Sequence, residues 1–292
     1  MSKHNALYLF IWLALVFPVC VVADGWNPNT SASNTHSIVN TRHNLMIDYS
    51  PFVDRMSGAR NDYGEVCVYC HTPHGASTVM GNAPLWNRTK RDVSFTPYNM
   101  TTMLNQTVTE PGSSSLMCLS CHDGITSVDS IINMPGSGRY DVNQETVNSI
   151  DFLNTWSDTR GHFQLSRCAD VCHNDDNIHV SDHSFEAFII GSDLSDDHPV
   201  GIEYPTQFGD GVDFKVPTLS TDKYSFFDSD GDSRLDKNEV RMYNTGGVYK
   251  VECGSCHDPH GVESNGVGSE FIPSFLRVNN QQSGLCLTCH TK

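Results

Sequence analysis

Cysteine and histidine recur in this chain at one spacing that has a specific chemical meaning. The pattern C-x-x-C-H occurs four times in the 292 residues. Two thiols at this spacing can add across the two vinyl groups of a haem, and the next residue then places an imidazole beneath the iron. The predicted attachment sites are Cys67/Cys70/His71, Cys118/Cys121/His122, Cys253/Cys256/His257 and Cys286/Cys289/His290. The sequence therefore predicts four haem c groups, each with its own proximal histidine.

Other sites also use closely spaced cysteines, namely zinc ribbons, thioredoxin-like dithiols and structural disulfides. None of them requires a histidine directly after each second cysteine. Four such coincidences in one chain favour haem. A zinc-stabilised secreted scaffold is the alternative that a colourless purified protein would support.

The stretch RCADVCHNDDNIH, residues 167–179, resembles these motifs but has one residue more between its cysteines. We predict a fifth haem here, with thioether bonds to Cys168 and Cys172 and with His173 as the proximal ligand. A disulfide between the two cysteines is the alternative, because residues four apart can approach on a helix. Three spare histidines lie nearby, which a disulfide would not need: His162, His179 and His183. The sixth ligand of this haem is expected to be His162 or His183.

Histidines are numerous enough to give every iron a second axial ligand. Of the 14, five are predicted proximal ligands and His4 lies near the amino terminus, which leaves eight. His74 and His260 each follow a proximal histidine by three residues, so on a helical turn they cannot reach the opposite face of the same iron. Each is therefore expected to bind a neighbouring haem, or else to hydrogen-bond a propionate or a carbonyl. His198 is a further candidate, which Pro199 holds extended.

The first 23 residues are predicted to be a signal peptide, with an uncleaved membrane anchor as the alternative. Its removal takes away Cys20, which leaves ten cysteines in five close pairs, and Lys3, which leaves 17 basic against 34 acidic residues, a net charge of −17. We therefore expect an exported protein, extracellular or on the cell surface after periplasmic transit. Nucleic acid and anionic membranes are poor partners for such an acidic chain.

Four regions follow the leader: an N-terminal arm (24–66), a first haem module (67–124), a middle region (125–252) and a second haem module (253–292). Each module has a long motif, C-x-x-C-H-x-P-H-G, and then a short one, which is an internal repeat. Short helices are expected around the CH motifs and after Asp236, and neither a long helix nor a sheet is predicted elsewhere. The apolar content is modest, so something other than aliphatic side chains is expected to fill the interior.

An aspartate-rich segment of the middle region, FFDSDGDSRLDKNEV, has the spacing of an EF-hand loop. Its glycine stands at loop position 4 rather than 6, where Ser233 would make the sharp turn. The predicted calcium ligands, at positions 1, 3, 5, 7, 9 and 12, are Asp228, Asp230, Asp232, the Arg234 carbonyl, Asp236 and Glu239. A solvated acidic turn that caps a short helix is the alternative.

Several ordered motifs together resemble the doubled-CxxCH class of outer-membrane multihaem cytochromes, which includes tetrahaem proteins that polymerise into extracellular nanowires. They span much of residues 40–292: RHNLM, CVYCHTPHG, LWNR, CLSCHDG, DDHPVG, VECGSCHDPHG, FLRVNN and CLTCH. The resemblance implies a multihaem cytochrome fold of mostly irregular coil and short helices, with little sheet, around a stacked haem chain. It also implies the distal ligands His43, His74, His198 and His260. One ligand can come from a neighbouring subunit, and His43 on the N-terminal arm is a candidate donor.

These expectations combine into an electron-transfer protein rather than an enzyme, with further copies of itself, other redox cytochromes or extracellular electron acceptors as partners and no small-molecule substrate. The alternative is a multihaem reductase of a small oxyanion or nitrogen oxide. Such an enzyme needs one open iron position and basic residues that attract an anion. The spare histidines and the acidic charge balance both disfavour it.

Overall fold

The computed structural model describes residues 32–46, 63–78, 83–88, 93–124, 126, 131–133 and 189–292. The predicted leader and the predicted fifth haem site at Cys168, Cys172 and His173, with His162 and His183, lie outside these residues. Within the described ranges, no helix is both long enough and apolar enough to cross a membrane.

All four C-x-x-C-H motifs of the described ranges lie on short helical turns. The first is on the 3-10 helix η3 (Cys67–Tyr69), the second ends α1 (Ser113–His122), and the others form α4 (Cys253–Cys256) and α5 (Cys286–Cys289). The prediction of short helices around these motifs is confirmed. Three further 3-10 turns are η1 (Ile38–Asn40), η6 (Pro273–Phe275) and η7 (Gln281–Ser283).

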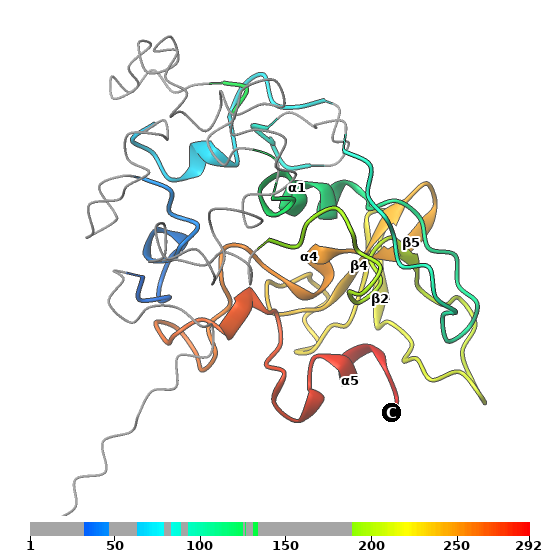
Figure 1. Ribbon diagram of the computed structural model, residues 1–292. Coiled ribbons are helices and arrows are strands. Elements are labelled where there is room, and N and C mark those ends of the chain that lie inside the picture. Colours follow the sequence, from blue (N-terminus) through cyan, green and yellow to red (C-terminus); the bar gives the residue numbers. More distant parts are fainter. Residues whose placement is uncertain are drawn as a thin grey trace, which may run out of the picture.

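An antiparallel sheet of five short strands supports these helices, in the order β1-β5-β4-β3-β2. The strands are β1 (Ile202–Glu203), β2 (Leu219–Ser220), β3 (Tyr224–Phe226), β4 (Arg241–Thr245) and β5 (Val248–Val251). Gly246 and Gly247 join β4 to β5 with positive φ at both positions, as a tight hairpin turn requires. Figure 1 shows α4 between α1 and β4, and it contacts both. The third motif, on α4, therefore lies between the second motif and the sheet.

The prediction of a helix after Asp236 is wrong, because the chain makes a turn at residues 237–238 and then enters β4. Glu239 is 1% exposed, and its carboxylate accepts hydrogen bonds from the backbone N–H groups of Ser229 and Asp236. Val240, which is also buried, then begins the extended chain of the sheet. The side chain of Glu239 therefore closes the loop through these two hydrogen bonds.

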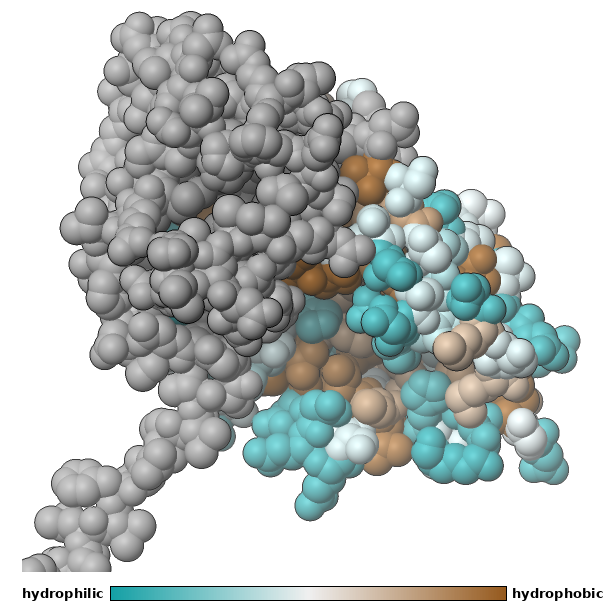
Figure 2. All heavy atoms as spheres, in the orientation of Figure 1, coloured by the Kyte–Doolittle hydropathy of each residue, from teal (hydrophilic) through white to brown (hydrophobic). Residues whose placement is uncertain are grey.

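Buried apolar residues form small separate clusters beside the motif helices. One contains Tyr63, Val68 and Tyr69 next to η3, and another brings Leu119 of α1 together with Phe95 and Leu194. On the coloured part of the face in Figure 2, hydrophobic residues gather in a recess and hydrophilic ones cover the projecting parts.

Candidate functional site

Each C-x-x-C-H motif forms a turn that carries two thiols and one imidazole. The backbone N–H of His71 donates to the carbonyl of Cys67 at 2.8 Å, and His257 and His290 make the same contact within their motifs at 3.1 and 2.9 Å. The described cysteines that are predicted to form thioether bonds are free thiols, none of them in a disulfide: Cys67, Cys70, Cys118, Cys121, Cys253, Cys256, Cys286 and Cys289. Covalent attachment of haem requires free thiols of this kind.

The second thiol of the second motif lies close to the first motif. Cys121 is on the last turn of α1 and is partly buried. Burial raises the pKa of Cys70 to about 12, and the charge of Cys121 is the next cause of this increase. The Cys70 thiol is therefore protonated at neutral pH. Haems attached through Cys70 and Cys121 would have neighbouring attachment points.

Several histidine rings are oriented through one nitrogen by a backbone carbonyl. Nδ1 of His71 lies 2.7 Å from the carbonyl oxygen of Pro84, that of His257 lies 2.8 Å from Ser274, and that of His43 lies 3.1 Å from Pro259. A carbonyl can only accept, so Nδ1 carries the proton in each ring. Nε2 is then left with a lone pair for a metal, which is the usual arrangement of a metal-binding histidine.

Two pairs of histidine rings lie at a centroid separation that fits two ligands of one iron. The ring centroids of His71 and His260 are 6.1 Å apart, and those of His43 and His122 are 6.2 Å apart. Two imidazoles on one metal, with metal–nitrogen bonds of about 2 Å, have ring centres about 6 Å apart. The ring planes meet at 10° in the first pair and 79° in the second. Neither angle conflicts with binding of one metal by both rings of a pair, because an imidazole can bind at any rotation about its metal–nitrogen bond.

The electrostatics of these rings favour the neutral form that a ligand needs. Burial and the neighbouring His122 lower the pKa of His43 to about 4. Burial also lowers the pKa of His71, and it does the same for His257 and His290. These rings are therefore available to a metal at neutral pH.

The two other predicted distal ligands, His198 and His74, lie in different surroundings. His198 lies near His290, because its charge is a second cause, after burial, of the lowered pKa of His290. The side chain of His74 is in an exposed residue. Across the described ranges, no ring contact joins His74 to a proximal histidine. The structure thus brings His43, His198 and His260 to proximal histidines but leaves His74 at the surface.

A buried carboxylate joins the helices of the second and third motifs, a feature that the sequence analysis missed. Glu252 caps the N-terminus of α4, and its oxygens accept from the N–H of Gly112 at 3.0 and 3.1 Å and from the hydroxyl of Ser115 at 2.5 Å. In return, the Ser115 hydroxyl accepts from the N–H of Cys253 at 2.9 Å. Each helix therefore caps the other, and the thiols of Cys118 and Cys253 lie close enough to shift each other's pKa, upward for Cys118 and downward for Cys253.

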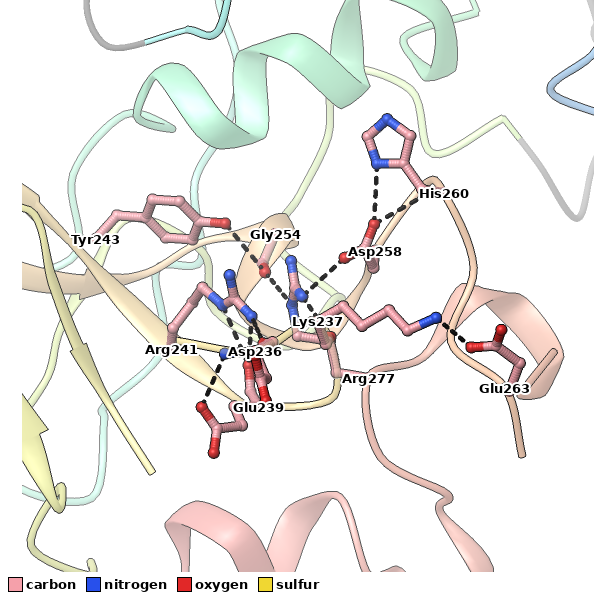
Figure 3. Close-up of polar contacts among 10 residues, drawn as sticks. All are labelled: Asp236, Lys237, Glu239, Arg241, Tyr243, Gly254, Asp258, His260, Glu263 and Arg277. Carbon is pink, nitrogen blue, oxygen red and sulfur yellow. Dashed lines mark hydrogen bonds and ion pairs between the residues drawn. The ribbon is translucent and has the colours of Figure 1, made fainter. Parts of the chain in front are cut away.

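Three of the predicted calcium ligands come together. Asp228, Asp230 and Asp232 each offer a carboxylate oxygen, and these oxygens all lie within 4.8 Å of one another. Glu239 is instead turned toward backbone N–H groups, and the carbonyl of Asp236 accepts from Arg241 (Figure 3). Ser233 has a φ of 67° and makes the predicted sharp turn.

Residues 246–292, which contain the third and fourth motifs, match the family model described as the doubled CXXCH motif. The chain matches none of the curated protein sequences with which it was compared. The doubled motif implies covalent binding of haem c and suggests electron transfer as the role of the chain.

Proposed function

We propose that this protein is an exported multihaem c-type cytochrome in which closely packed bis-histidine haems carry electrons along the molecule. The observation that carries the proposal is the pairing of His71 with His260 and of His43 with His122 at the separation that one iron requires. Haem c, when bound, supplies a one-electron iron couple.

Cysteine and histidine side chains would have different roles in binding haem. The motif cysteines would bind the haem covalently, the histidines that follow them would ligate its iron, and His43, His198 and His260 would supply second ligands. The mutual capping of α1 and α4 keeps Cys118 and Cys253 in contact. The groups attached to these two motifs are thereby held next to each other, which favours short electron-transfer distances.

The mass of the intact mature protein tests haem binding, because each thioether-bound haem adds a fixed increment. We expect at least four increments and a fifth at Cys168 and Cys172, together with a low-spin absorption spectrum. His260→Ala is expected to open one iron to cyanide, and the surface variant His36→Ala is its control. A protein without haem increments would contradict the proposal.

The enzymatic alternative is a reductase of a small oxyanion or nitrogen oxide. It needs an iron with one open position, whereas His71 and His122 each have a second histidine about 6 Å away between ring centroids. Rapid cyanide binding and a high-spin signal in the wild-type protein would favour this alternative.

We further propose that copies of the chain assemble into an extracellular filament that conducts electrons between redox cytochromes or extracellular acceptors. His43 lies beside His122 of its own chain, so the exposed His74 is the better candidate to ligate an iron of a neighbouring subunit. His74→Ala should shift the wild-type protein toward monomer in native mass spectra and electron micrographs, and His36→Ala should not. A monomeric wild-type protein in which every iron is six-coordinate from its own chain would contradict the filament.

Calcium is proposed as a second, structural ligand of the loop at residues 228–239. The supporting observation is the approach of the three aspartate carboxylates. Titration calorimetry with calcium should give one site that Asp230→Asn weakens at least tenfold, with the exposed Asp222→Asn as the control. Equal binding by the two variants would contradict this site.

A further inference from the structure

The carboxylate of Asp258 contacts the ring of His260 at Nδ1, and Arg277 in turn holds this carboxylate in place (Figure 3). Oδ1 of Asp258 lies 3.1 Å from Nδ1 of His260 and accepts from the backbone N–H of the same residue at 3.0 Å. Oδ2 accepts from Arg277 at 3.0 Å. The Arg277 guanidinium is buried and also donates to the carbonyls of Gly254 at 2.9 Å and Lys237 at 2.6 Å. Because Arg277 is anchored at three points, Asp258 cannot easily turn away from the imidazole.

The charge of this carboxylate reaches the ring through the hydrogen bond. Oδ1 accepts from the imidazole, while Oδ2 is paired with the buried Arg277 guanidinium at 3.0 Å. This salt bridge makes the carboxylate an anionic acceptor for Nδ1–H of His260. A histidine that donates Nδ1–H to an anion is a stronger electron donor to a metal through Nε2.

Other histidines of the site have neutral acceptors. Nδ1 of His43, His71 and His257 faces a backbone carbonyl oxygen. In the first repeat, Thr72 occupies the position that matches Asp258, and its hydroxyl donates to the carbonyl of His74 at 2.9 Å. The two long motifs, CHTPHG and CHDPHG, therefore differ at the residue that contacts the second histidine.

We infer that Asp258, held by Arg277, is a positioning residue that lowers the reduction potential of the haem bound between His71 and His260. The inference rests on the proposed function, since it concerns one haem of the predicted set. A more strongly donating ligand stabilises ferric iron relative to ferrous iron, and hydrogen bonds around the ligands are a recognised means of tuning such potentials. The haem potentials along the chain would then be unequal, with a low-potential site where the two modules meet.

The test is a spectroelectrochemical titration of Asp258→Asn and Asp258→Thr in the full haem-loaded protein. Asparagine keeps an acceptor without charge, and threonine is the residue that the first repeat already has at this position. We expect one haem to become easier to reduce by about tenfold in its reduction equilibrium, which is about 59 mV for a one-electron couple. The other haems should not move. Asp258→Glu, which keeps the charge, should stay nearer the wild type, and the exposed Asp222→Asn controls for the change in net charge.

Haem load is measured separately on each variant from the intact mass. If the wild-type protein carries no haem, the proposed function itself fails. If the variants carry every haem and no potential moves, the proposed function stands and the tuning role of Asp258 is overturned. Loss of one haem in both Asp258→Asn and Asp258→Thr would overturn it as well, because Asp258 would then be needed to build the site rather than to tune it.

Discussion

At the residue scale, the sequence predicted candidate histidine ligands but not which histidines lie beside one another. The proximal ligands follow from adjacency to a cysteine, which is a local pattern. The partner of His71 is His260, on a distant part of the chain, and no local spacing encodes that contact. The motif repeat did indicate that His260 must reach away from its own motif. Asp258 was visible in the sequence as the one difference between the two long motifs after the C-x-x-C-H, but its proposed role depends on Arg277, which only the fold brings near.

Phe275 is expected to hold the ring of His43 in place. Their centroids are 4.5 Å apart, with 25° between the planes. Phe275→Ala should lose about 1 kcal/mol of aromatic contact and let His43 leave the iron part of the time. A partial high-spin signal and faster cyanide binding at one haem would show this. Phe208→Ala, whose ring packs against Tyr204 rather than a histidine, should bind cyanide as slowly as the wild type, and equal rates in the two variants would contradict the prediction.

Removing both thiols of the C-x-x-x-C-H stretch at residues 168–173 tests whether this stretch binds a haem. Cys168→Ser combined with Cys172→Ser should lower the intact mass by one haem increment in addition to the change in side chains. The reason is that His173 directly follows the second cysteine, as in the four regular motifs. Cys20→Ser lies in the predicted leader and is the matched control, with no effect on mature mass. An unchanged haem count would instead assign the two cysteines to a disulfide.

At the scale of elements, the motif helices were predictable and the sheet was not. A helical turn across each C-x-x-C-H follows from the need to place two thiols and an imidazole together. The strands are two to five residues long, which is too short for a period-two pattern to stand out. The prediction of a helix after Asp236 was also wrong, because the carboxylate of Glu239 accepts hydrogen bonds from backbone N–H groups within the loop itself.

The mutual cap between α1 and α4 should be a main source of stability for this junction. Glu252→Ala leaves the buried N–H of Gly112 and hydroxyl of Ser115 without their acceptor, at an expected loss of about 1–3 kcal/mol in the free energy of unfolding. Denaturant unfolding followed by near-ultraviolet circular dichroism measures it. Glu110→Ala, at an exposed residue just before α1, is the control and should change stability little. Equal midpoints for the two variants would show that the cap contributes nothing.

The same carboxylate should make stability depend on pH. Burial raises the pKa of Glu252 above its ordinary value of 4.5, although the bonds from Ser115 and Gly112 and the charge of Lys250 oppose this. The folded state therefore favours the protonated acid, and its contribution is fully present below the unfolded pKa and declines as pH rises through the folded pKa. Relative to Glu252→Gln, the wild type should lose stability as the pH rises above the ordinary glutamate pKa of 4.5. A difference between the two proteins that stays constant as the pH rises would contradict the assignment.

At the scale of the whole molecule, two small apolar clusters of the described residues lie beside the first and second motifs, and further buried apolar residues, such as Phe226 and Met242, lie in the sheet. Tyr63, Val68 and Tyr69 pack under the first motif, while Leu119 packs on the side of α1. That groups other than aliphatic side chains fill the rest of the interior stays a prediction. The distances between paired histidines leave room for such groups in the described part of the chain.

Copies of this protein can assemble only if contacts between them outweigh the repulsion between their negative charges. The sequence carries a formal net charge of −16, so two copies repel each other at long range. Screening shortens that repulsion from about 30 Å at 0.01 M salt to about 8 Å at 0.15 M. If contacts between subunits are made by ligation through His74 and by apolar packing, added salt should increase the assembled fraction of the wild-type protein. Light scattering against ionic strength measures this, with sucrose of equal osmolality as the control. Assembly that dissolves as salt rises would instead mean that ion pairs across the interface hold the copies together, and the proposed ligand-based contact would lose its support.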